Sequence, residues 1–596
     1  MKLSSKKMLY SALAMMLCFA MLMGCAPKAE PSASPSGTPA EESKPVEETP
    51  EVQSGKFKAG TYTASGKGIY GADIVISVTV DENSILSIDV EEEETKGIGD
   101  YAIELVKNVI LETQALNVDA ISGATLSSSV FIRGVKEALT EAGADIASLS
   151  SGEAYYKIYE DTKADVVVVG AGAAGMLSSI ELVEGGKSVI LLEKQGILGG
   201  NTLLATTSLS GADSETQKKN GTEAPADEFY ESLISAPEVA PEYAKALADN
   251  SKFLIDRVAK GGGDVITPGP SSNFSLVTSD GGAPGLEVVA GLKSEMDRIG
   301  VDYRLNNAAT EIIMKDGKAS GVKVKTPNGE YTIEADTVLL TSGGYAASKE
   351  LINEYAPEWE SLGTTNSSGM TGDGQVMAEA VGAALTNMPE FSINPSAYNT
   401  GYSLLSFTAF RFAGAIMVNK AGERFTNELN SKYTEMTNDV QAQEGQLAYL
   451  VFDQAILDSN GLMKYYQSLG FLKEGDTLEV LAAEIDVDAA GLAATIETYN
   501  ASAAAGVDED FGRPYIIIAM ETPKYYACKI EPALHGTYGG VSISLNGEAL
   551  DAEGNVIPGL YAAGCVADMR LWSTNPTMHA PGAFGHIAAQ HIIENS

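Results

Sequence analysis

One stretch of this sequence, residues 165–202, restricts the possible folds more than any other. An apolar run at 166–169, preceded by Asp165, is followed by a glycine-rich turn, Gly-Ala-Gly-Ala-Ala-Gly, at 170–175, and a second apolar run at 189–192 leads to Glu193. This order predicts a buried strand, a turn that opens a helix, and a second, parallel strand. We therefore expect an α/β domain with a Rossmann-like sheet.

The same turn predicts a ligand. Gly170 suits a tight turn, Gly172 lets backbone N–H groups approach a pyrophosphate, and Gly175 lets the helix pack against the strand. Glu193 follows the second strand, where an acid binds a ribose hydroxyl. With both strands and the acid at the proper distance, the stretch predicts a dinucleotide site. A glycine turn without a ligand is the alternative.

The overall charge excludes one class of partner. The chain has 596 residues, 80 of them acidic and 40 basic, for a net charge of −40. Such a surface repels phosphate backbones, so we expect no nucleic-acid partner. The length predicts several domains, and a hydrophobic fraction of 44% is ample for their cores.

The N-terminus has the features of an export signal. Lysines near the start precede an apolar segment at 8–23 that is short for a membrane span. The segment leads into Leu-Met-Gly-Cys, which resembles the bacterial lipobox, whose cysteine becomes the lipidated first residue. We expect a signal peptide over 1–24 and an extracytoplasmic protein anchored in the cell membrane through Cys25; cleavage nearby is the alternative. Residues 25–55, rich in Pro, Ser, Glu and Ala, predict a disordered tether.

A small α+β unit is expected at 56–145, followed by a linker at 146–162. Alternating and helical apolar spacing predicts strands at 74–80 and 85–90 and helices at 100–112 and 127–142.

Between the predicted helices lies Asp119-Ala-Ile-Ser122-Gly-Ala-Thr125-Leu-Ser-Ser. This decapeptide resembles the flavinylation motif of bacterial FMN-binding domains. The resemblance implies that a flavin transferase joins FMN to the Thr125 hydroxyl through a phosphoester. Asp119 is expected to assist in positioning a metal ion or the hydroxyl. The alternative is a plain helix N-cap built on Thr125 or Ser122.

The rest of the chain, about 163–596, resembles the soluble flavoproteins of the fumarate reductase, flavocytochrome c and urocanate reductase family. The likeness rests on the glycine fingerprint and on short segments after it, notably Gly199-Gly-Asn-Thr202, Thr341-Ser-Gly-Gly344, Gly372-Asp-Gly374, Gly422-Glu-Arg-Phe-Thr-Asn-Glu428 and Gly559-Leu-Tyr-Ala-Ala-Gly564. It implies a FAD-binding domain at 163–388 and 535–596, with an inserted α+β cap domain at 389–534.

The resemblance also implies residues that hold FAD without a covalent bond. They are Gly170, Gly172, Ala174, Gly175, Glu193, Lys194, Gly200, Asn201, Thr202, Thr206, Thr207, Ala309, Gly343, Asp373, Cys565, Ala588 and Ala589.

The chemistry implied is hydride transfer from FAD to the β-carbon of an activated alkene, with a side-chain acid that protonates the α-carbon. The arginine that serves as the family's acid is replaced by Lys432, and Tyr433 beside it is a second candidate donor. Arg411 is retained from a proton-relay position, whereas the acid three residues before it has become Thr408. His535 is the remaining candidate in the active site.

Other substitutions weaken the family's grip on a dicarboxylate. Asn394 and Gly536 align with two substrate-binding histidines, and Ala583 with a carboxylate-binding arginine. An unpaired carboxylate in such a pocket is costly, so fumarate is disfavoured. An aromatic or bulky monocarboxylate, or an enone, fits better. Aromatic residues at the start of the cap either stack on such a substrate or form the core of the cap: Phe391, Tyr398, Tyr402, Phe407, Phe410 and Phe412.

No metal site is predicted. All four histidines lie in the last 62 residues, and His586 and His591 are spaced poorly for one helix face. Cys528 and Cys565 are expected as thiols, with one disulfide as the alternative.

Together these features predict an oxidoreductase that reduces the C=C bond of an unsaturated carboxylate or carbonyl compound. Electrons are expected to pass from a membrane donor through FMN to FAD. A dehydrogenase of a ketone or steroid-like substrate, and a non-catalytic flavin electron carrier, are the alternatives.

Overall fold

The computed structural model describes residues 55–68, 73–94, 97–235, 239–269, 272–401, 403–515, 517–571 and 578–595. All of them belong to one compact unit, Ser54–Ser596. The predicted signal peptide, Cys25 and most of the tether lie outside the described residues, as does Tyr402. Among the helices of the described ranges, none is long and apolar enough to cross a membrane.

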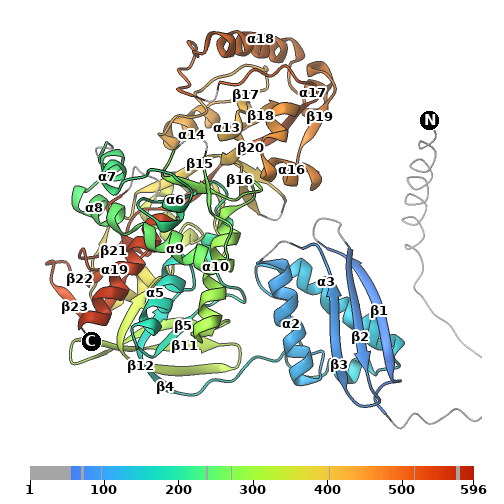
Figure 1. The fold of residues 1–596 in the computed structure, drawn as a ribbon, viewed down its shortest axis with the longest axis vertical. Helices are drawn as coiled ribbons and strands as arrows, with labels where there is room; N and C mark the ends of the chain where they lie inside the picture. Colours follow the sequence, from blue (N-terminus) through green and yellow to red (C-terminus); the bar gives the residue numbers. More distant parts are fainter. Residues whose placement is uncertain are drawn as a thin grey trace, which may run out of the picture. The chain divides into compact units, whose positions relative to one another are not determined.

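The N-terminal part of this unit is a three-stranded antiparallel sheet with two helices packed on it (Figure 1). The predicted strands and helices are all confirmed. The elements are β1 (Gly60–Lys67), β2 (Asp73–Val80), β3 (Ile85–Glu91), α2 (Gly99–Thr113) and α3 (Thr125–Glu141). Alternation of buried and solvent-facing residues along β2 places Ile74, Ile76 and Val78 in a core with Phe131 of α3.

The central part is an eight-stranded mixed sheet whose parallel strands confirm the Rossmann-like prediction. β12 pairs in parallel with both β4 and β23, and β5 pairs in parallel with β4 and β9. The strands are β4 (Thr162–Val169), β5 (Val189–Leu192), β9 (Asp302–Arg304), β10 (Ala308–Lys315), β11 (Lys318–Thr326), β12 (Gly329–Leu340), β22 (Glu548–Leu550) and β23 (Val556–Ala562).

Helices cover this sheet and hold its two sequence halves together. α5 packs on α19, which returns from the end of the chain, and also on α10 (Figure 1). Their apolar faces join the strands in the largest core of the protein. The helices are α5 (Ala173–Glu184), α7 (Ala226–Ile234), α8 (Pro241–Asn250), α9 (Lys252–Lys260), α10 (Pro284–Ile299), α12 (Asp373–Ala380) and α19 (His579–Asn595).

A second sheet of seven strands forms the cap region. β20 is its central strand, and it passes without a break through the expected boundary at 534–535. The elements are β13 (Gly363–Thr364), β15 (Phe391–Asn399), β16 (Leu404–Ser406), α13 (Thr408–Ala413), β17 (Ile416–Val418), α14 (Tyr433–Gln441), β18 (Ala448–Asp453), α16 (Gly461–Ser468), β19 (Lys473–Gly475), α17 (Leu478–Ile485), α18 (Ala489–Ala505) and β20 (Tyr525–Thr537).

Three aromatic residues at the start of the cap, Tyr398, Phe407 and Phe410, stack on one another. Phe407 is fully buried and stacks on Phe410, Tyr398 and Tyr466, with ring centroids 4.5, 4.9 and 4.8 Å away. These rings belong to the core of the cap. Of the two interpretations of this aromatic run, core packing therefore holds for Phe407 and Phe410.

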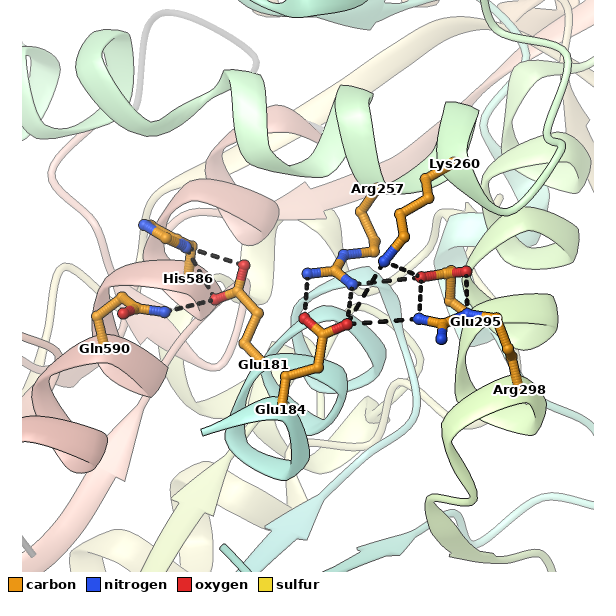
Figure 2. Close-up of polar contacts among 8 residues, drawn as sticks. All are labelled: Glu181, Glu184, Arg257, Lys260, Glu295, Arg298, His586 and Gln590. Atoms are coloured by element: carbon orange, nitrogen blue, oxygen red, sulfur yellow. Dashed lines mark hydrogen bonds and ion pairs between the residues drawn. The ribbon is translucent and has the colours of Figure 1, made fainter. Parts of the chain in front are cut away.

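The buried carboxylate of Glu295 connects α10 to α9 in the FAD-binding region (Figure 2). Glu295, with a side chain 3% exposed, lies 2.8 Å from Arg298, 2.9 Å from Lys260 and 3.3 Å from Arg257. Arg257 also pairs with Glu184 of α5 at 2.7 Å. Hydrogen bonding from Arg298 is the largest cause that lowers the pKa of Glu295 to about 2.

A second contact joins α5 to α19. His586 Nδ1 lies 2.8 Å from the Glu181 carboxylate (Figure 2). The His586 ring also stacks on Phe253, with centroids 3.6 Å apart. Both carboxylates of α5 thus contact helices that are distant in sequence, which secures the two halves of the FAD-binding region.

The Glu295 cluster predicts an acid-dependent loss of stability. The folded-state pKa lies below the unfolded-state value of 4.5, so the stabilisation is full above pH 4.5 and disappears as the pH falls towards about 2. We expect Glu295→Gln to lower the melting temperature at pH 7 and to flatten its decline between pH 5 and 3. Glu215→Gln, which removes an exposed pair with Lys218, is the matched control and is expected to change neither.

Candidate functional site

The glycine fingerprint brings two turns into close contact. Gly170 has φ of +107°, and a Cβ there would lie 2.6 Å from Ser342 Cα in the turn after β12. A Cβ on Gly175 would lie 2.0 Å from the Gly170 carbonyl oxygen. The Thr341 hydroxyl donates to that same carbonyl at 2.7 Å. Only glycine fits at both positions, and the two turns form one rigid edge of the sheet.

Next to this contact lies a more open backbone. The nearest atoms to a Cβ on Gly172 are 3.7 and 3.8 Å away, so a methyl group there would make only ordinary van der Waals contacts. Gly172 is the N-cap of α5; the N–H of Ala173 donates to Thr202 Oγ1, and the helix dipole favours an anion beside the N–H groups that follow. The Glu193 carboxylate accepts from the N–H of Ala171 at 3.0 Å and of Gln195 at 2.8 Å. Burial raises the pKa of Glu193.

Three buried polar atoms in and beside the second turn have no partner among the described residues. Ser342 Oγ, Gln375 Oε1 and Thr537 Oγ1 are buried and have no hydrogen-bond partner within the described ranges. Ser342 lies next to Gly343, and the Gln375 amide donates to the Gly343 carbonyl at 3.1 Å. A buried polar atom without a partner is costly, so these atoms fit a polar ligand such as FAD along the two turns.

The remaining residues predicted to bind the cofactor lie in several helices, strands and loops of the FAD-binding region. Lys194 pairs with Asp373 at 2.6 Å, and Thr202 Oγ1 accepts from the N–H of Ala173 at 3.0 Å. Ala309 lies in β10, and Cys565 follows β23. Cys565 and Cys528, which lies in β20, are both free thiols. The others are Ala174 in α5, Gly200 and Asn201 in η1 (Gly200–Leu204), Thr206 and Thr207 after it, and Ala588 and Ala589 in α19.

Thr125 is the first residue of α3, and its side chain is exposed. The N-cap of this helix is Ala124, and no side chain caps it. The alternative that Thr125 or Ser122 serves as a capping residue is therefore wrong. An exposed hydroxyl in a tight turn suits enzymatic modification, and it is the position that the motif predicts for FMN.

On the cap side, Arg411 is a fully buried cation. Its guanidinium donates to the Glu428 carbonyl at 2.8 Å and lies 3.4 Å from Thr408 Oγ1, while Nε has no partner. Within the described ranges its hydrogen bonds reach no carboxylate. Since an uncompensated buried charge costs several kcal/mol, about 3–5 in comparable cases, this position favours an anionic group nearby.

Tyr433 and Lys432 occupy different environments although they are neighbours. The Arg411 guanidinium carbon lies 4.8 Å from the centroid of the Tyr433 ring, which is half-buried. The Lys432 side chain is 72% exposed, and its Nζ lies 2.9 Å from Glu435. Of the two predicted proton donors, the structure places Tyr433 against Arg411 and directs Lys432 towards solvent.

His535 and Tyr538 lie near this pair on and after β20. The Thr365 hydroxyl lies 2.7 Å from His535 Nδ1. Removal from water, with a contribution from Arg411, lowers the pKa of His535 to about 4, so the imidazole is neutral at pH 7. Burial raises the pKa of Tyr538 to about 12, and its nearest titratable neighbours include Tyr433 and Cys565. Tyr538 was not predicted, because its neighbours are distant in sequence.

Asn394 completes a hydroxyl network behind Arg411. This residue is fully buried, and its side-chain amide donates to Ser406 at 2.6 Å and to Thr408 at 3.2 Å. Thr408 in turn contacts Arg411. A hydroxyl and an amide thus stand where the family resemblance implies an acid and a histidine.

The Arg-Phe-Thr-Asn-Glu segment of the cap builds the support for Arg411. Glu428 is fully buried and pairs with Arg424 at 2.9 Å and with Arg513 at 3.3 Å. Asp508 pairs with Arg424 at 3.0 Å, and Arg513 donates to the Arg411 carbonyl at 2.9 Å. These charges neutralise one another. The cluster contacts Arg411 at two points, its guanidinium through the Glu428 carbonyl and its own carbonyl through Arg513.

No group of His, Cys, Asp and Glu residues within the described ranges could hold a metal ion.

Comparison with known families and proteins gives matches over both parts. Residues 165–578 match the family described as FAD binding domain, and residues 70–140 match the FMN-binding domain. The urocanate reductase of Eggerthella lenta is 29% identical over 91% of this chain and 90% of its own length. A fumarate reductase (cytochrome) of Shewanella frigidimarina is 34% identical over 67% of this chain and 71% of its own.

A solved structure and a longer relative complete the comparison. The open conformation of a flavocytochrome c3 fumarate reductase superposes with a TM-score of 0.63 at 27% identity, covering 76% of this chain and 84% of that one. The chain spans only 55% of the NADH:fumarate oxidoreductase of Klebsiella pneumoniae, with 29% identity over 85% of this chain.

Two glycine variants separate the fold from the cofactor site. Gly175→Ala is expected to lower the melting temperature of the apoprotein, because its methyl group would collide with backbone only 2.0 Å away. Gly172→Ala is expected to leave that temperature unchanged, because its methyl group has room, but to weaken FAD binding at least about tenfold by blocking the approach to the helix N-terminus. Thermal unfolding of apoprotein and FAD titration measure the two effects. Equal FAD affinity in Gly172→Ala and wild type would contradict the placement of the pyrophosphate.

Proposed function

Because this chain belongs to the family of FAD-dependent fumarate, flavocytochrome c and urocanate reductases, with an additional FMN-binding domain, we propose that it reduces an activated carbon–carbon double bond. The proposed substrate carries a single carboxylate or carbonyl group conjugated to the alkene, as in a urocanate-like or aryl-acrylate compound. The relatives are named as urocanate, fumarate and acrylate reductases, all of which are oxidoreductases of CH–CH groups.

The observation that carries this proposal is the balance of charge around Arg411. It is one fully buried cation, next to a neutral imidazole and two phenols. Such a set can compensate one negative charge, whether a substrate carboxylate or the enolate that forms during reduction. The neighbouring cations, Arg424 and Arg513, are already paired with Glu428 and Asp508, so a second carboxylate would find no unpaired cation among the residues described around Arg411. This disfavours a dicarboxylate such as fumarate.

Tyr433 is the proposed proton donor to the α-carbon. Its ring lies against the Arg411 guanidinium, which holds the phenol in place beside the other residues of the proposed site. Arg411 is then a positioning residue. The side chains of Ser406, Asn394 and Thr408 form a hydrogen-bonded network that ends at Arg411. His535 is proposed to orient the substrate: when its Nδ1 accepts from Thr365, its Nε2 donates to a carbonyl or carboxylate oxygen.

FAD, when bound and reduced by two electrons, would supply a hydride to the β-carbon, and one proton from Tyr433 would complete the conversion of C=C to CH–CH. The two electrons consumed are proposed to come from a membrane donor through the flavin on Thr125. The lipobox-like segment supports an extracytoplasmic location with a lipid anchor at Cys25, which would keep the enzyme near that donor.

Substitution of the two candidate donors tests the chemistry. We expect Tyr433→Phe to lower kcat at least about 100-fold, because it removes the proton while keeping the ring over Arg411. Lys432→Met is the matched control and is expected to change kcat less than about threefold, because the lysine side chain faces solvent. Turnover is measured with holoenzyme, reduced methyl viologen and a set of aryl-acrylates, enones and fumarate.

Other outcomes would contradict parts of the proposal. A loss confined to Lys432→Met would identify the lysine as the donor. Faster turnover of fumarate than of any monocarboxylate would refute the inferred specificity. Oxidation of a saturated ketone with a dye acceptor, with no alkene reduced, would indicate a dehydrogenase instead. Passage of electrons to dyes without turnover of either class would indicate an electron carrier.

The proposed anchor is tested by Cys25→Ser in the full chain. The wild-type protein is expected in the membrane fraction and the variant, which has no thiol to acylate, in the soluble fraction. Immunoblotting of both fractions gives the result. Equal distribution of the two proteins would refute lipidation at Cys25.

A further inference from the structure

At the contact between the FMN-attachment turn and the FAD-binding segment, a glycine of each segment faces an isoleucine of the other. A Cβ on Gly196 would lie 3.2 Å from Ile121 Cγ2 and 3.6 Å from the Ser122 nitrogen. A Cβ on Gly123 would lie 3.0 Å from Ile197 Cγ2. The two backbones therefore approach as closely as packed core segments do, with almost no space left for a side chain at either position.

The residues at this contact are core residues. Ile197 is 3% exposed and belongs to the core of the FAD-binding region. Ile121 packs against that core and also against the core of the N-terminal sheet. One side chain thus joins two hydrophobic cores directly before the turn that carries Thr125.

Further contacts hold the same turn from other sides. The Tyr156 hydroxyl donates to Asp119 at 2.8 Å, and the Tyr156 carbonyl accepts from Asn328 at 2.6 Å. Farther along the interface, Tyr101 of α2 is 8% exposed, and Lys293 Nζ of α10 lies 4.9 Å from its ring centroid.

The turn itself is also internally rigid. Ser128 Oγ accepts from the Ile121 N–H at 3.0 Å and donates to the Ala124 carbonyl at 2.8 Å. Both ends of the Ser122–Gly123 turn are thereby held by one side chain, and Thr125 follows directly.

The segment on the other side of the contact leads to the proposed active site. Asn201 accepts from the Ser367 N–H at 2.8 Å, and Asn366 donates to the His535 carbonyl at 2.8 Å. Gly196 and Asn201 are five residues apart, which limits their separation to about 18 Å. The attachment turn thus contacts the same short segment that reaches the substrate side of the FAD site.

We propose that the turn carrying Thr125 is permanently docked on residues 195–198 through Ile121, Gly123, Gly196 and Ile197, so that the two flavin sites are held at one fixed separation. The proposal rests on the proposed function only for the direction in which electrons pass. It specifies that FMN and FAD exchange electrons without a swinging movement of the N-terminal domain.

A pair of complementary substitutions tests the docking. Gly196→Val inserts a side chain against Ile121, and Ile121→Ala removes the side chain that it meets. In the full-length apoprotein we expect Gly196→Val to speed hydrogen exchange of 121–124 and 195–198 at least about tenfold, with exchange in β2 and β4 unchanged. The double variant Ile121→Ala/Gly196→Val is expected to regain most of the protection, because the space is restored. Ile121→Ala alone is the control for the lost methyl groups.

A kinetic measurement on holoenzyme gives a second readout. Enzyme reduced with dithionite is mixed with an alkene substrate, and the reoxidation of each flavin is followed by stopped-flow absorbance. We expect one first-order phase for FMN that is independent of solvent viscosity in wild type, at least about tenfold slower in Gly196→Val, and restored in the double variant. FAD content is matched in all samples.

The outcomes distinguish docking from function. Wild-type exchange and wild-type rates in Gly196→Val, or failure of the double variant to recover, would refute docking. A viscosity-dependent rate in wild type would show a moving domain instead. Protected segments in an enzyme whose flavins no alkene reoxidises would uphold docking and refute the proposed function.

Discussion

The contact between the turns that follow β4 and β12 is the constraint on which the rest of the structure depends. Gly170 and Gly175 leave no space for a Cβ, and Thr341 links the second turn to the Gly170 carbonyl. Because β4 and β12 are adjacent and parallel, both turns emerge at the same edge of the sheet. The buried oxygens of Ser342, Gln375 and Thr537 have no hydrogen-bond partner within the described ranges. Unpartnered polar groups of this kind fit a site for a polar ligand such as a dinucleotide.

The substrate side depends on a different interaction, the neutral balance of buried charge in the cap. Glu428 pairs with Arg424 and Arg513, and Asp508 pairs with Arg424. The two negative and two positive charges of this cluster therefore cancel. Arg411 is held by this cluster through backbone contacts only, and it keeps its own charge uncompensated. The protein thereby separates a cation that supports the fold from a cation that is available to a reacting group. Under the proposed function, loss of the family's second arginine and histidines would change specificity and leave this charge cluster of the cap intact.

Much of the fold followed from local sequence. The strands and helices of the FMN-binding part were predicted within a few residues, because apolar spacing determines which face of each element is buried. The glycine fingerprint was equally local. The cap was predicted less well: its aromatic run was left open between substrate binding and packing, since a sequence does not say which rings meet. Phe407 proved to stack on Tyr466, some sixty residues later in the chain, and Phe407 and Phe410 belong to the core of the cap.

What the sequence alone determined about this protein is its cofactor chemistry. The fingerprint at 170–175 with Glu193, and the motif around Thr125, act through backbone conformation over a few consecutive residues, and short segments specify such conformation on their own. Tertiary structure alone decided which side chains meet at the substrate end. Tyr433 lies on Arg411 while Lys432 beside it faces solvent, because consecutive residues at a helix N-terminus point in different directions. Tyr538 and the packing of Ile121 on Gly196 arise from segments far apart in the chain, and only the packed core brings them together.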